Sequence, residues 1–398
     1  MRVLIVAREY PPETGWGGIA TFNYHLAHGL KDEGHEVDIL SFNLSVPSDT
    51  VKEGIRVVRV VSYWNVLPWE TSMFLFFYLY QLKIWRTFME LNKTRQYDIV
   101  DCPDHLAEGF GIIRSGIVPT TLRFYSPWSW ISTNSLNLKE KWYDIKGIKW
   151  MEKACVKGAH CLTSPSQDLA DKVRDFFKVN KKIEIIGNPI DISSFSPDRN
   201  LDGDPIKILF AGRLEPRKGP DVLARAIPLV CNEVKNVEFI FLGSDCPSKT
   251  SASTKNELKE YLGSQGVLCY VNFLDHVPLL ELPKIYNSVD IVVVPSRYDT
   301  SPYVCQEAMA CGRAVVGTTA GGMPEYMDFG EAGMLVQPED SLALARAIIT
   351  LAKNSELRNR LGYIARKRVE EQYDRRVIAR KTTELYKEAI KIHKSKNK

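Results

Sequence analysis

The chain has 398 residues, which is too long for one ordinary hydrophobic core and long enough for two domains. Its 44% hydrophobic and 25% charged residues are typical of a globular protein, and the net charge of +4 is small for this length. The one dense basic run, residues 393–398, is typical of a solvated end. Nucleic acid is therefore not expected as the main partner.

The beginning of the chain reads as a first strand rather than a signal peptide, because its apolar run is short and no small-residue cleavage site follows. The longest aromatic run, Met73 to Tyr80, is too short to span a bilayer. The 8 cysteines show no C-x-x-C spacing, which favours small buried thiols in a reducing compartment. We therefore expect a cytoplasmic protein.

The first half of the chain alternates between strand and helix patterns. A strand at 3–7, a glycine-rich loop, a helix ending at Gly34 and a strand at 36–41 form a βαβ opening, which predicts a parallel sheet. Further strands are expected at 55–61, 98–102, 120–124 and at both ends of 160–187, with helices at 72–91, 106–114 and about 139–157.

The predicted helix 72–91 has many aromatic residues: Phe74, Phe76, Phe77, Tyr78, Tyr80, Trp85 and Phe88. Packing in the core is one interpretation. An acceptor groove or a membrane-contact face, assisted by Lys83 and Arg86, is the other.

A turn-rich stretch divides the chain, and we predict a first domain at 1–190, a linker at 191–205, a second domain at 206–372 and a last helix at 373–398. Strands are expected at 206–211, 237–242, 270–274, 291–295 and 314–317, with helices at 220–234, after a capping box of Thr254 and Glu257, and throughout 342–391. The predicted fold class is α/β, with two doubly wound, Rossmann-like domains facing each other across a cleft. Their ligand loops would lie at the carboxyl ends of the strands.

The stretch from Val293 to Glu325 has the strongest chemical pattern. A buried strand runs into a loop, and a helix is predicted to begin with Ser301 as its N-cap and Pro302 as its first residue. Asp299 and Glu307 lie on either side of this helix start, where amide groups and the helix dipole favour a phosphate. A ligand with a phosphate and several hydroxyls fits this pattern, although both carboxylates can also be surface or capping groups.

A second loop offers positive charge. Arg213 and Lys218 flank a glycine-bounded turn after a strand, where two cations can neutralise a diphosphate and the charge that develops as it leaves. The alternative is a solvated basic loop.

The first domain offers weaker candidates. Gly17 and Gly18 either let the backbone approach a phosphate or only form a turn, because the G-x-G-x-x-G pattern is absent. His105 is either a base or acceptor contact, or a structural residue. His25 and His28 have no suitable third ligand nearby, so no metal site is expected.

Together these stretches resemble the retaining glycosyltransferases of family 4, which have the GT-B fold. The resemblance covers nearly the whole chain and is strongest in P-S-R-Y-D-T-S-P-Y-V-C-Q-E-A-M-A-C-G. The other matching stretches are A-G-R-L-E-P-R-K-G, G-G-M-P-E, G-N-P-I-D and P-E-T-G-W-G-G-I-A.

The resemblance implies a nucleotide-diphosphate sugar donor on the second domain, with a UDP-sugar favoured and a GDP-sugar as the alternative. Arg213 and Lys218 would bind the diphosphate, Glu307 the ribose and Asp299 the sugar hydroxyls. The remaining implied donor contacts are Ser301, the amides of Tyr303 and Val304, Gly322, and Gly17 and Gly18 from the first domain. No metal or cofactor is implied, and the last helix would return to the first domain.

Three residues depart from the family pattern. Asp299 replaces the usual glutamate, Pro302 replaces a common glycine and removes an amide, and Tyr125 stands where the family often has a histidine. Because tyrosine is a poor base near neutral pH, His105 is the nearest substitute for that histidine. Asp104, Tyr125 and Trp128 are the predicted acceptor contacts.

The expected function is transfer of the sugar, with retention and by front-face attack, to a hydroxyl of a glycan, lipid-linked or small-molecule acceptor. The enzyme would be cytoplasmic, with peripheral contact at the inner membrane face as an option. The alternatives are a GT-B nucleotide-sugar epimerase, a phosphorylase or a non-catalytic nucleotide-sugar-binding protein.

Overall fold

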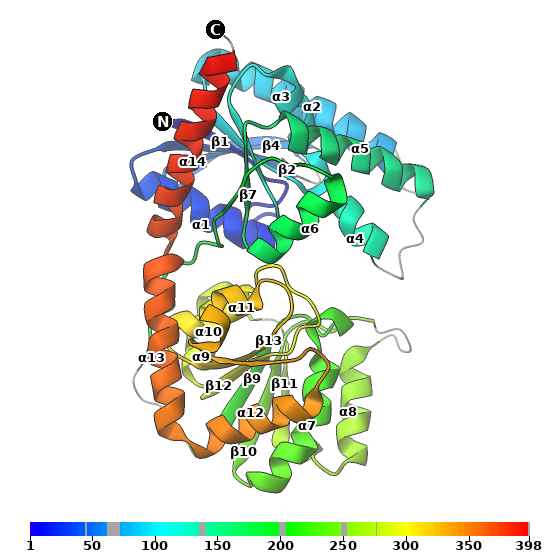
Figure 1. Cartoon of the computed structure of the whole chain (residues 1–398), viewed down its shortest axis with the longest axis vertical. Helices are drawn as coiled ribbons and strands as arrows, with labels where there is room; N and C mark the ends of the chain where they lie inside the picture. Colours follow the sequence, from blue (N-terminus) through cyan, green and yellow to red (C-terminus); the bar gives the residue numbers. More distant parts are fainter. Residues whose placement is uncertain are drawn as a thin grey trace. The chain divides into compact units, whose positions relative to one another are not determined.

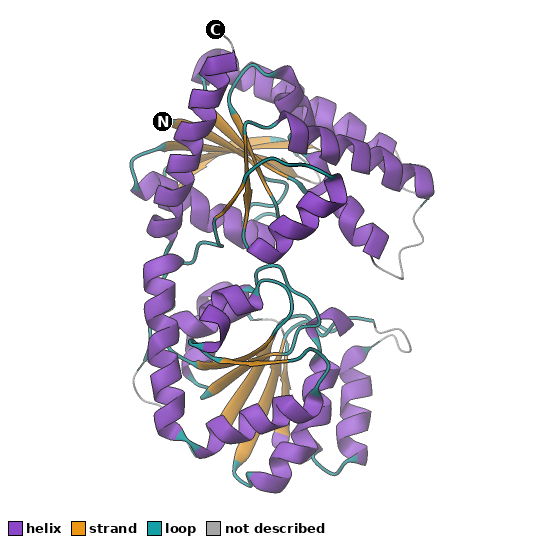
Figure 2. Cartoon of the chain, in the orientation of Figure 1, coloured by secondary structure: helices purple, strands orange, loops and turns teal. Residues whose placement is uncertain are grey.

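Two α/β units make up the chain, and each is described by itself. The computed structural model describes residues 1–43, 46–61, 72–134, 141–198, 204–247, 253–275 and 277–396. Unit 1 comprises Met1–Pro189 and Arg375–Lys398, and unit 2 comprises Ile190–Asp374. In each unit a sheet is covered by helices (Figures 1 and 2).

Unit 1 is built on an eight-stranded sheet with the order β3-β4-β2-β1-β5-β6-β7-β8. All neighbouring strands are parallel except β3, which pairs antiparallel with β4 at the edge. The strands are β1 Arg2–Val6, β2 Glu36–Asn43, β3 Ser48–Lys52, β4 Ile55–Val61, β5 Ile99–Pro103, β6 Thr120–Arg123, β7 Cys161–Ser164 and β8 Ile183–Ile185.

Helices cover both faces of this sheet. They are α1 Gly18–Asp32, α2 Met73–Arg95, α3 Phe110–Ser115, α4 Trp128–Asn134, α5 Trp142–Gly158, α6 Gln167–Phe177 and α14 Arg375–Lys396. Helices α2, α3 and α5 lie side by side on one face, whereas α14 packs against α1 and against β5, β6 and β7 on the other (Figure 1). The last helix of the chain therefore belongs to the unit that contains the first strand.

The aromatic residues of α2 form core, as the first interpretation predicted. Phe76, Phe77, Tyr80 and Phe88 are buried in one cluster with the apolar side chains of the sheet, α5 and α6. A Cβ atom on Gly147 of α5 would lie 2.5 Å from the Phe74 ring, so the glycine allows α2 and α5 to pack closely.

A buried polar network holds α14 on the sheet. The Tyr386 hydroxyl donates to Asp101 Oδ2 at 2.7 Å, and Arg123 Nη2 donates to the same oxygen at 3.0 Å. The Arg123 guanidinium also lies 4.8 Å from the centre of the Phe22 ring of α1. Each buried charge thus has a partner, which such groups require.

Unit 2 is a six-stranded parallel sheet with the order β11-β10-β9-β12-β13-β14. This is the strand order of a doubly wound dinucleotide-type fold. Its strands are β9 Ile206–Ala211, β10 Val237–Leu242, β11 Val271–Leu274, β12 Ile291–Val294, β13 Ala314–Thr318 and β14 Met334–Val336. Its helices are α7 Pro220–Glu233, α8 Thr254–Ser264, α9 Leu282–Asn287, α10 Tyr303–Ala310, α11 Met323–Tyr326, α12 Ser341–Lys353 and α13 Ser355–Gln372. The prediction of two parallel-sheet α/β domains is confirmed.

Several predicted boundaries need correction. The first part of the stretch predicted as linker 191–205 packs within unit 2, because Phe195 is buried next to Tyr286. The helix predicted at 106–114 is interrupted, since Leu106 and Ala107 both have φ of 55°, and α3 begins only at Phe110. The N-cap of α8 is Ser253 rather than Thr254, and its side chain accepts from the Asn256 amide at 3.0 Å.

Candidate functional site

The strand order of unit 2 brings two distant loops together. Strand β9 lies between β10 and β12, so the loops that follow β9 and β12 leave the same edge of the sheet next to each other. Ligands of doubly wound sheets bind at this reversal of strand order. The first loop carries Lys218 and the second carries Asp299.

Lys218 and Asp299 form an ion pair at this edge. The Lys218 ammonium donates to Asp299 Oδ2, and Arg217 Nη1 lies 3.8 Å from the same oxygen. Burial alone would raise the pKa of Asp299, but the charges of Lys218 and Arg217 outweigh it and hold that pKa below its ordinary value. Asp299 is therefore a charged, preorganised hydrogen-bond acceptor.

Arg297 fixes the two loops against each other. Its guanidinium donates two hydrogen bonds of 2.8 Å to Asp221 at the start of α7 and one of 2.6 Å to Glu339. Its backbone amide donates to the Arg217 carbonyl at 2.9 Å. Gly219 completes the contact, because a Cβ atom there would lie 2.1 Å from the Pro295 carbonyl oxygen.

Arg213 occupies the same loop as Lys218 but has a different partner. Its Nη2 lies 3.0 Å from Glu215 Oε2, and Glu215 also accepts from Arg217 at 2.8 Å. Arg217 was not predicted as a site residue, although its position directly before Lys218 in a basic loop was a usable signal.

The start of α10 differs from the prediction. Pro302 is the N-cap and Tyr303 the first helical residue, so Ser301 does not cap the helix. Its hydroxyl lies 2.6 Å from the Tyr326 hydroxyl instead. Cys305 is the first residue whose amide donates to the Pro302 carbonyl, so the amides of Tyr303 and Val304 precede the helical hydrogen bonds.

Glu307 lies one turn further along α10 and is buried. Its Oε2 accepts from the Tyr286 hydroxyl at 2.7 Å. Burial raises the pKa of Glu307 to about 7, although the Tyr286 hydrogen bond opposes the shift. Tyr286 was not predicted, because nothing in the sequence links residue 286 to the next helix.

The second glycine turn packs on the Asp299 backbone. The Gly322 amide donates to the Asp299 carbonyl at 2.9 Å. Gly321 has a φ of +64°, and a Cβ atom there would lie 2.0 Å from the same carbonyl oxygen. The predicted residues Lys218, Asp299 and Gly322 are thus joined through three loops, and Glu307 lies one turn into the helix that follows the Asp299 loop.

Unit 1 has an equivalent reversal of strand order at β1, which lies between β2 and β5. The loop after β1 leads to Gly17, the N-cap of α1, and Gly18, its first residue. A Cβ atom on Gly17 would lie 2.9 Å from Glu9 Oε2, and the first turn of α1 has no acidic residue. The helix dipole at this start favours an anion, whereas the nearby Glu9 carboxylate opposes one, so the phosphate contact of Gly17 and Gly18 stays a prediction.

The loop after β5 carries Asp104 and His105. The imidazole Nδ1 of His105 lies 3.2 Å from the Ser126 carbonyl, so that nitrogen carries the proton and Nε2 is the acceptor. Burial lowers the pKa of His105 to about 4, which keeps the ring neutral at pH 7. A neutral imidazole can accept a hydrogen bond from a sugar hydroxyl but is a weak base.

Asp104 shapes the neighbouring loop. Its two carboxyl oxygens accept from the amides of Tyr125 at 2.9 Å and Ser126 at 3.3 Å. The Tyr125 hydroxyl donates to Asn23 Oδ1 at 3.2 Å. The three predicted residues Asp104, His105 and Tyr125 therefore lie together at the carboxyl ends of β5 and β6.

Glu152 of α5 is a positioning residue that sequence reasoning missed. Its carboxyl accepts from the amides of Trp128 at 2.8 Å, Ser129 at 3.2 Å and Leu106 at 3.2 Å. Burial raises the pKa of Glu152 to about 8. The predicted acceptor residue Trp128 is thus held at the start of α4 by Glu152. A carboxylate on the apolar face of the predicted helix was the one available signal.

Within the described ranges, no group of three or more His, Cys, Asp or Glu side chains could hold a metal ion. The expected metal independence stays a prediction.

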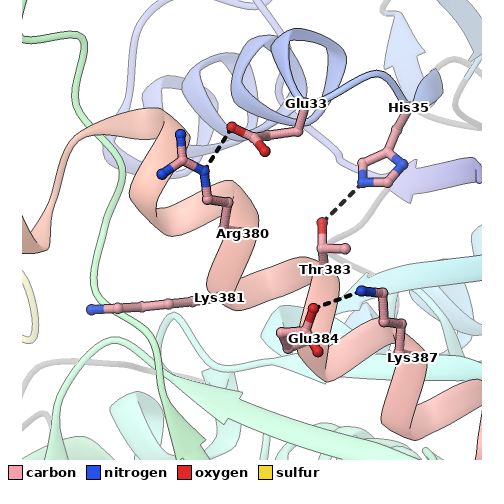
Figure 3. A pocket seen from close by; sticks show the side chains of 7 residues that line it. All are labelled: Glu33, His35, Arg380, Lys381, Thr383, Glu384 and Lys387. Carbon is pink, nitrogen blue, oxygen red and sulfur yellow. Dashed lines mark hydrogen bonds and ion pairs between the residues drawn. The ribbon is translucent and has the colours of Figure 1, made fainter.

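A groove of about 540 Å³ lies elsewhere in unit 1, between α14 and the segment that joins α1 to β2 (Figure 3). Four of its charged residues pair with one another, since Arg380 donates to Glu33 at 2.9 Å and Lys387 to Glu384 at 2.7 Å. His35 lies just before β2, at the strand's amino end, whereas the predicted site loops follow the carboxyl ends. The groove is a contact of α14 and not the predicted site.

Comparison with known proteins identifies the class. The model of glycosyltransferase family 4 matches residues 16–194, and the model of glycosyl transferases group 1 matches residues 191–368. The chain therefore belongs to the family 4 glycosyltransferases, and its two parallel-sheet domains have the GT-B fold.

Relatives match over nearly the full length. An uncharacterized glycosyltransferase of Methanocaldococcus jannaschii is 27% identical over 98% of this chain and 99% of its own. A sucrose-phosphate synthase of Thermosynechococcus elongatus superposes with a TM-score of 0.78 at 20% identity, covering 97% of this chain and 98% of its own. An Anabaena protein solved in complex with UDP and glucose gives a TM-score of 0.70 at 18% identity, covering 96% and 98%.

Proposed function

We propose that this chain is a retaining glycosyltransferase that uses a nucleotide-diphosphate sugar. The donor is a UDP-sugar, with a GDP-sugar as the alternative, and the acceptor is a hydroxyl of a glycan, a lipid-linked sugar or a small molecule. The observation that carries the proposal is the Lys218–Asp299 ion pair beside the start of α10, with Glu307 one turn further along. The Anabaena relative solved with UDP and glucose supports the choice of nucleotide.

The hydrogen-bonding groups of the site indicate how the donor would bind. Diphosphate oxygens would take over the hydrogen bonds that Lys218 now gives to Asp299 and that Arg213 gives to Glu215. The amides of Tyr303 and Val304, at the positive end of α10, would bind the same phosphates. Asp299 would then accept hydroxyls of the transferred sugar, and Glu307 those of the ribose.

The reaction proceeds by front-face attack. The acceptor oxygen forms a bond to the anomeric carbon on the face from which the diphosphate leaves, and the departing phosphate oxygen takes the acceptor proton. Lys218 and Arg213 stabilise the negative charge that develops on the leaving group. His105 orients the acceptor through Nε2 and does not remove its proton, because burial keeps the pKa of this histidine at about 4.

The location is part of the proposal. We place the enzyme in the cytoplasm, because six of its cysteines, at 102, 155, 161, 231, 305 and 311, are buried free thiols.

The test combines a donor panel with one substitution. Thermal-shift screening with nucleotide sugars identifies the donor, because a bound ligand raises the apparent stability. With that donor, Lys218→Ala should lower turnover by about 10²–10³-fold while the fold is unchanged. Lys353→Ala is the control, since Lys353 also pairs with a carboxylate, Glu233, at 2.7 Å in the same unit.

The product decides between the alternatives. Release of nucleoside diphosphate that requires an acceptor, with an unchanged anomeric configuration by NMR, supports retaining transfer. Conversion of the donor into an epimeric nucleotide sugar, without net release of nucleoside diphosphate, supports an epimerase. A requirement for orthophosphate supports a phosphorylase, and binding without turnover supports a binding protein. Near wild-type turnover of Lys218→Ala would overturn the assignment of this lysine.

A further inference from the structure

Helix α5 of unit 1 has one buried face and one exposed face. Ile148, Met151 and Cys155 pack into the core. On the opposite face, the side chains of Trp142 and Trp150 are 68% and 54% exposed, which is unusual for tryptophan. Tyr143 beside them is 42% exposed.

The exposed charges of this helix are all positive. Lys146 and Lys157 are exposed and Lys149 and Lys153 are half-buried, whereas the two acidic residues of the helix, Asp144 and Glu152, are buried. Asp144 accepts from the Ser72 hydroxyl and the Phe74 amide of α2, and Glu152 from the loop amides described above. None of the four lysines forms an ion pair with a carboxylate among the residues that the structure describes.

The lysines and aromatic rings are interleaved. Lys146 Nζ lies 4.7 Å from the centre of the Trp142 ring. The pKa of Lys149 is lowered mainly by its partial burial and to a smaller extent by the neighbouring charge of Lys153, while Glu152 opposes the shift.

The exposed patch continues onto α3, which packs next to α5 (Figure 1). The Trp150 and Phe110 ring centres are 5.3 Å apart, and the Arg114 guanidinium lies 6.0 Å from the Phe110 ring. Ile117, just after α3, is 45% exposed. We define the α5 face as Arg114, Trp142, Tyr143, Lys146, Trp150 and Lys153.

We propose that the α5 face binds the surface of a membrane that contains anionic lipids. Tryptophan and tyrosine rings favour the level of the lipid headgroups, and lysine side chains extend from there toward anionic phosphates. No helix in the described part of the chain is long and apolar enough to cross a membrane. The proposed contact is with the membrane surface.

The surface differs from the one suggested by the aromatic-rich segment 72–91, whose rings Phe76, Phe77, Tyr80 and Phe88 lie in the core. Nucleic acid is the less favoured partner, because the net charge is only +4 and the exposed Ile117 beside the α5 face is apolar. The inference is independent of the proposed transfer reaction, since binding is measured without donor or acceptor.

The test is vesicle flotation of the full-length protein. Vesicles of phosphatidylcholine alone are compared with vesicles in which about a third of the lipid is phosphatidylglycerol. We expect binding to the anionic vesicles that weakens as salt is raised. The double variant Lys146→Ala/Lys153→Ala should bind roughly thirtyfold more weakly, because each lysine near an anionic surface contributes about fivefold.

A second variant tests the rings. Trp142→Ala/Trp150→Ala should also reduce flotation, and this loss should persist at high salt because it removes apolar contact. The matched control is Tyr363→Ala/Lys367→Ala on α13, where an exposed tyrosine also lies 5.9 Å from a lysine. This variant should float like the unaltered protein.

Circular dichroism of each variant verifies the fold, which all these exposed substitutions should leave intact. The proposal is overturned if the protein does not bind anionic vesicles at low salt, or if neither α5 variant weakens binding. Binding of a single-stranded oligonucleotide, lost in the lysine variant and unaccompanied by flotation, would assign the face to nucleic acid instead.

Discussion

At the scale of single residues, the pairing of Lys218 with Asp299 shows what sequence reasoning reaches and where it ends. Each residue was predicted from its own loop, as a cation after one strand and a carboxylate after another. Their contact joins positions 81 residues apart and depends on β9 pairing with β12. Residue type and spacing identify such groups, but the strand order that brings them together is a property of the folded sheet.

Glu307 permits a prediction about pH. Burial raises its pKa to about 7, and ribose hydroxyls would donate hydrogen bonds to its ionised form. Donor binding therefore favours the carboxylate and should tighten as pH rises from 6 to 8. If only the carboxylate binds, the affinity for UDP should increase about fivefold to tenfold over this range. Isothermal titration calorimetry measures the affinity for UDP at each pH.

The control for this prediction is Glu307→Gln, which keeps the shape and removes the titration. UDP itself titrates in this range, so the difference between the two proteins is the informative quantity. The variant should bind more weakly at pH 8 and show a flatter pH dependence. Parallel curves for the two proteins would show that Glu307 does not control donor binding.

At the scale of elements, the sequence predicts the helices and strands that have a clear apolar pattern. It misses those that form through contacts with residues far away in the chain. Strand β3 was not predicted, because its residues are mostly exposed and it forms by pairing with β4. Helix α4 was missed for a similar reason, since Glu152 of α5 accepts hydrogen bonds from the amides at its start. The Ser301–Pro302 pattern predicted a helix start correctly and its cap wrongly, because the Ser301 hydroxyl is engaged by Tyr326.

The second glycine turn gives a prediction about stability. Gly321→Ala should strongly destabilise unit 2, because the φ of +64° is unfavourable and the new Cβ would lie 2.0 Å from the Asp299 carbonyl oxygen. The expected loss is about 3 kcal/mol or more. Urea unfolding followed by circular dichroism measures it.

Gly266→Ala separates the two causes. Gly266 has a φ of +68°, but a Cβ atom there would have no heavy atom within 4 Å. This control should lose only about 1 kcal/mol, the contribution of the backbone alone. Equal losses of unfolding free energy in the two variants would show that the clash with the Asp299 carbonyl does not contribute to the destabilisation.

At the scale of the whole molecule, the return of the last helix to unit 1 is the feature that joins the two ends of the chain. The helical pattern of the C-terminal segment was readable, and its return to the first domain was implied by the resemblance to family 4. The residues that hold it were not predicted, because Tyr386 and Asp101 are separated by 285 positions. Two further contacts of α14 involve histidines.

His160 and His393 form one of these contacts. His160 Nδ1 accepts from the Thr120 amide at 3.1 Å, and its Nε2 lies 3.2 Å from His393 Nδ1. Burial and the nearby positive groups, first His393, lower the pKa of His160 to about 4. A second proton on this ring would remove the acceptor that the Thr120 amide needs, so the folded state requires neutral His160.

The sign of the pH effect follows from this depressed pKa. An unfolded chain protonates His160 near pH 6.5, whereas the folded chain does so only near its value of about 4. The stabilising contribution is therefore complete above pH 6.5 and is lost as the pH falls toward 4. This contribution to the free energy of unfolding should amount to on the order of 2 kcal/mol.

The substitution His160→Asn tests this effect, because it keeps an acceptor near the Nδ1 position and removes the titration. Hydrogen exchange of the α14 amides is compared between the two proteins at equal pH. The unaltered protein should be the better protected at pH 6.5, and this difference in protection should narrow or reverse as the pH falls to 4. The carboxyls of Asp104, Glu108 and Glu152, whose pKa values burial raises, titrate in both proteins and cancel in this comparison. A difference in protection that stays constant from pH 6.5 to 4 would show that His160 does not couple the attachment of α14 to pH.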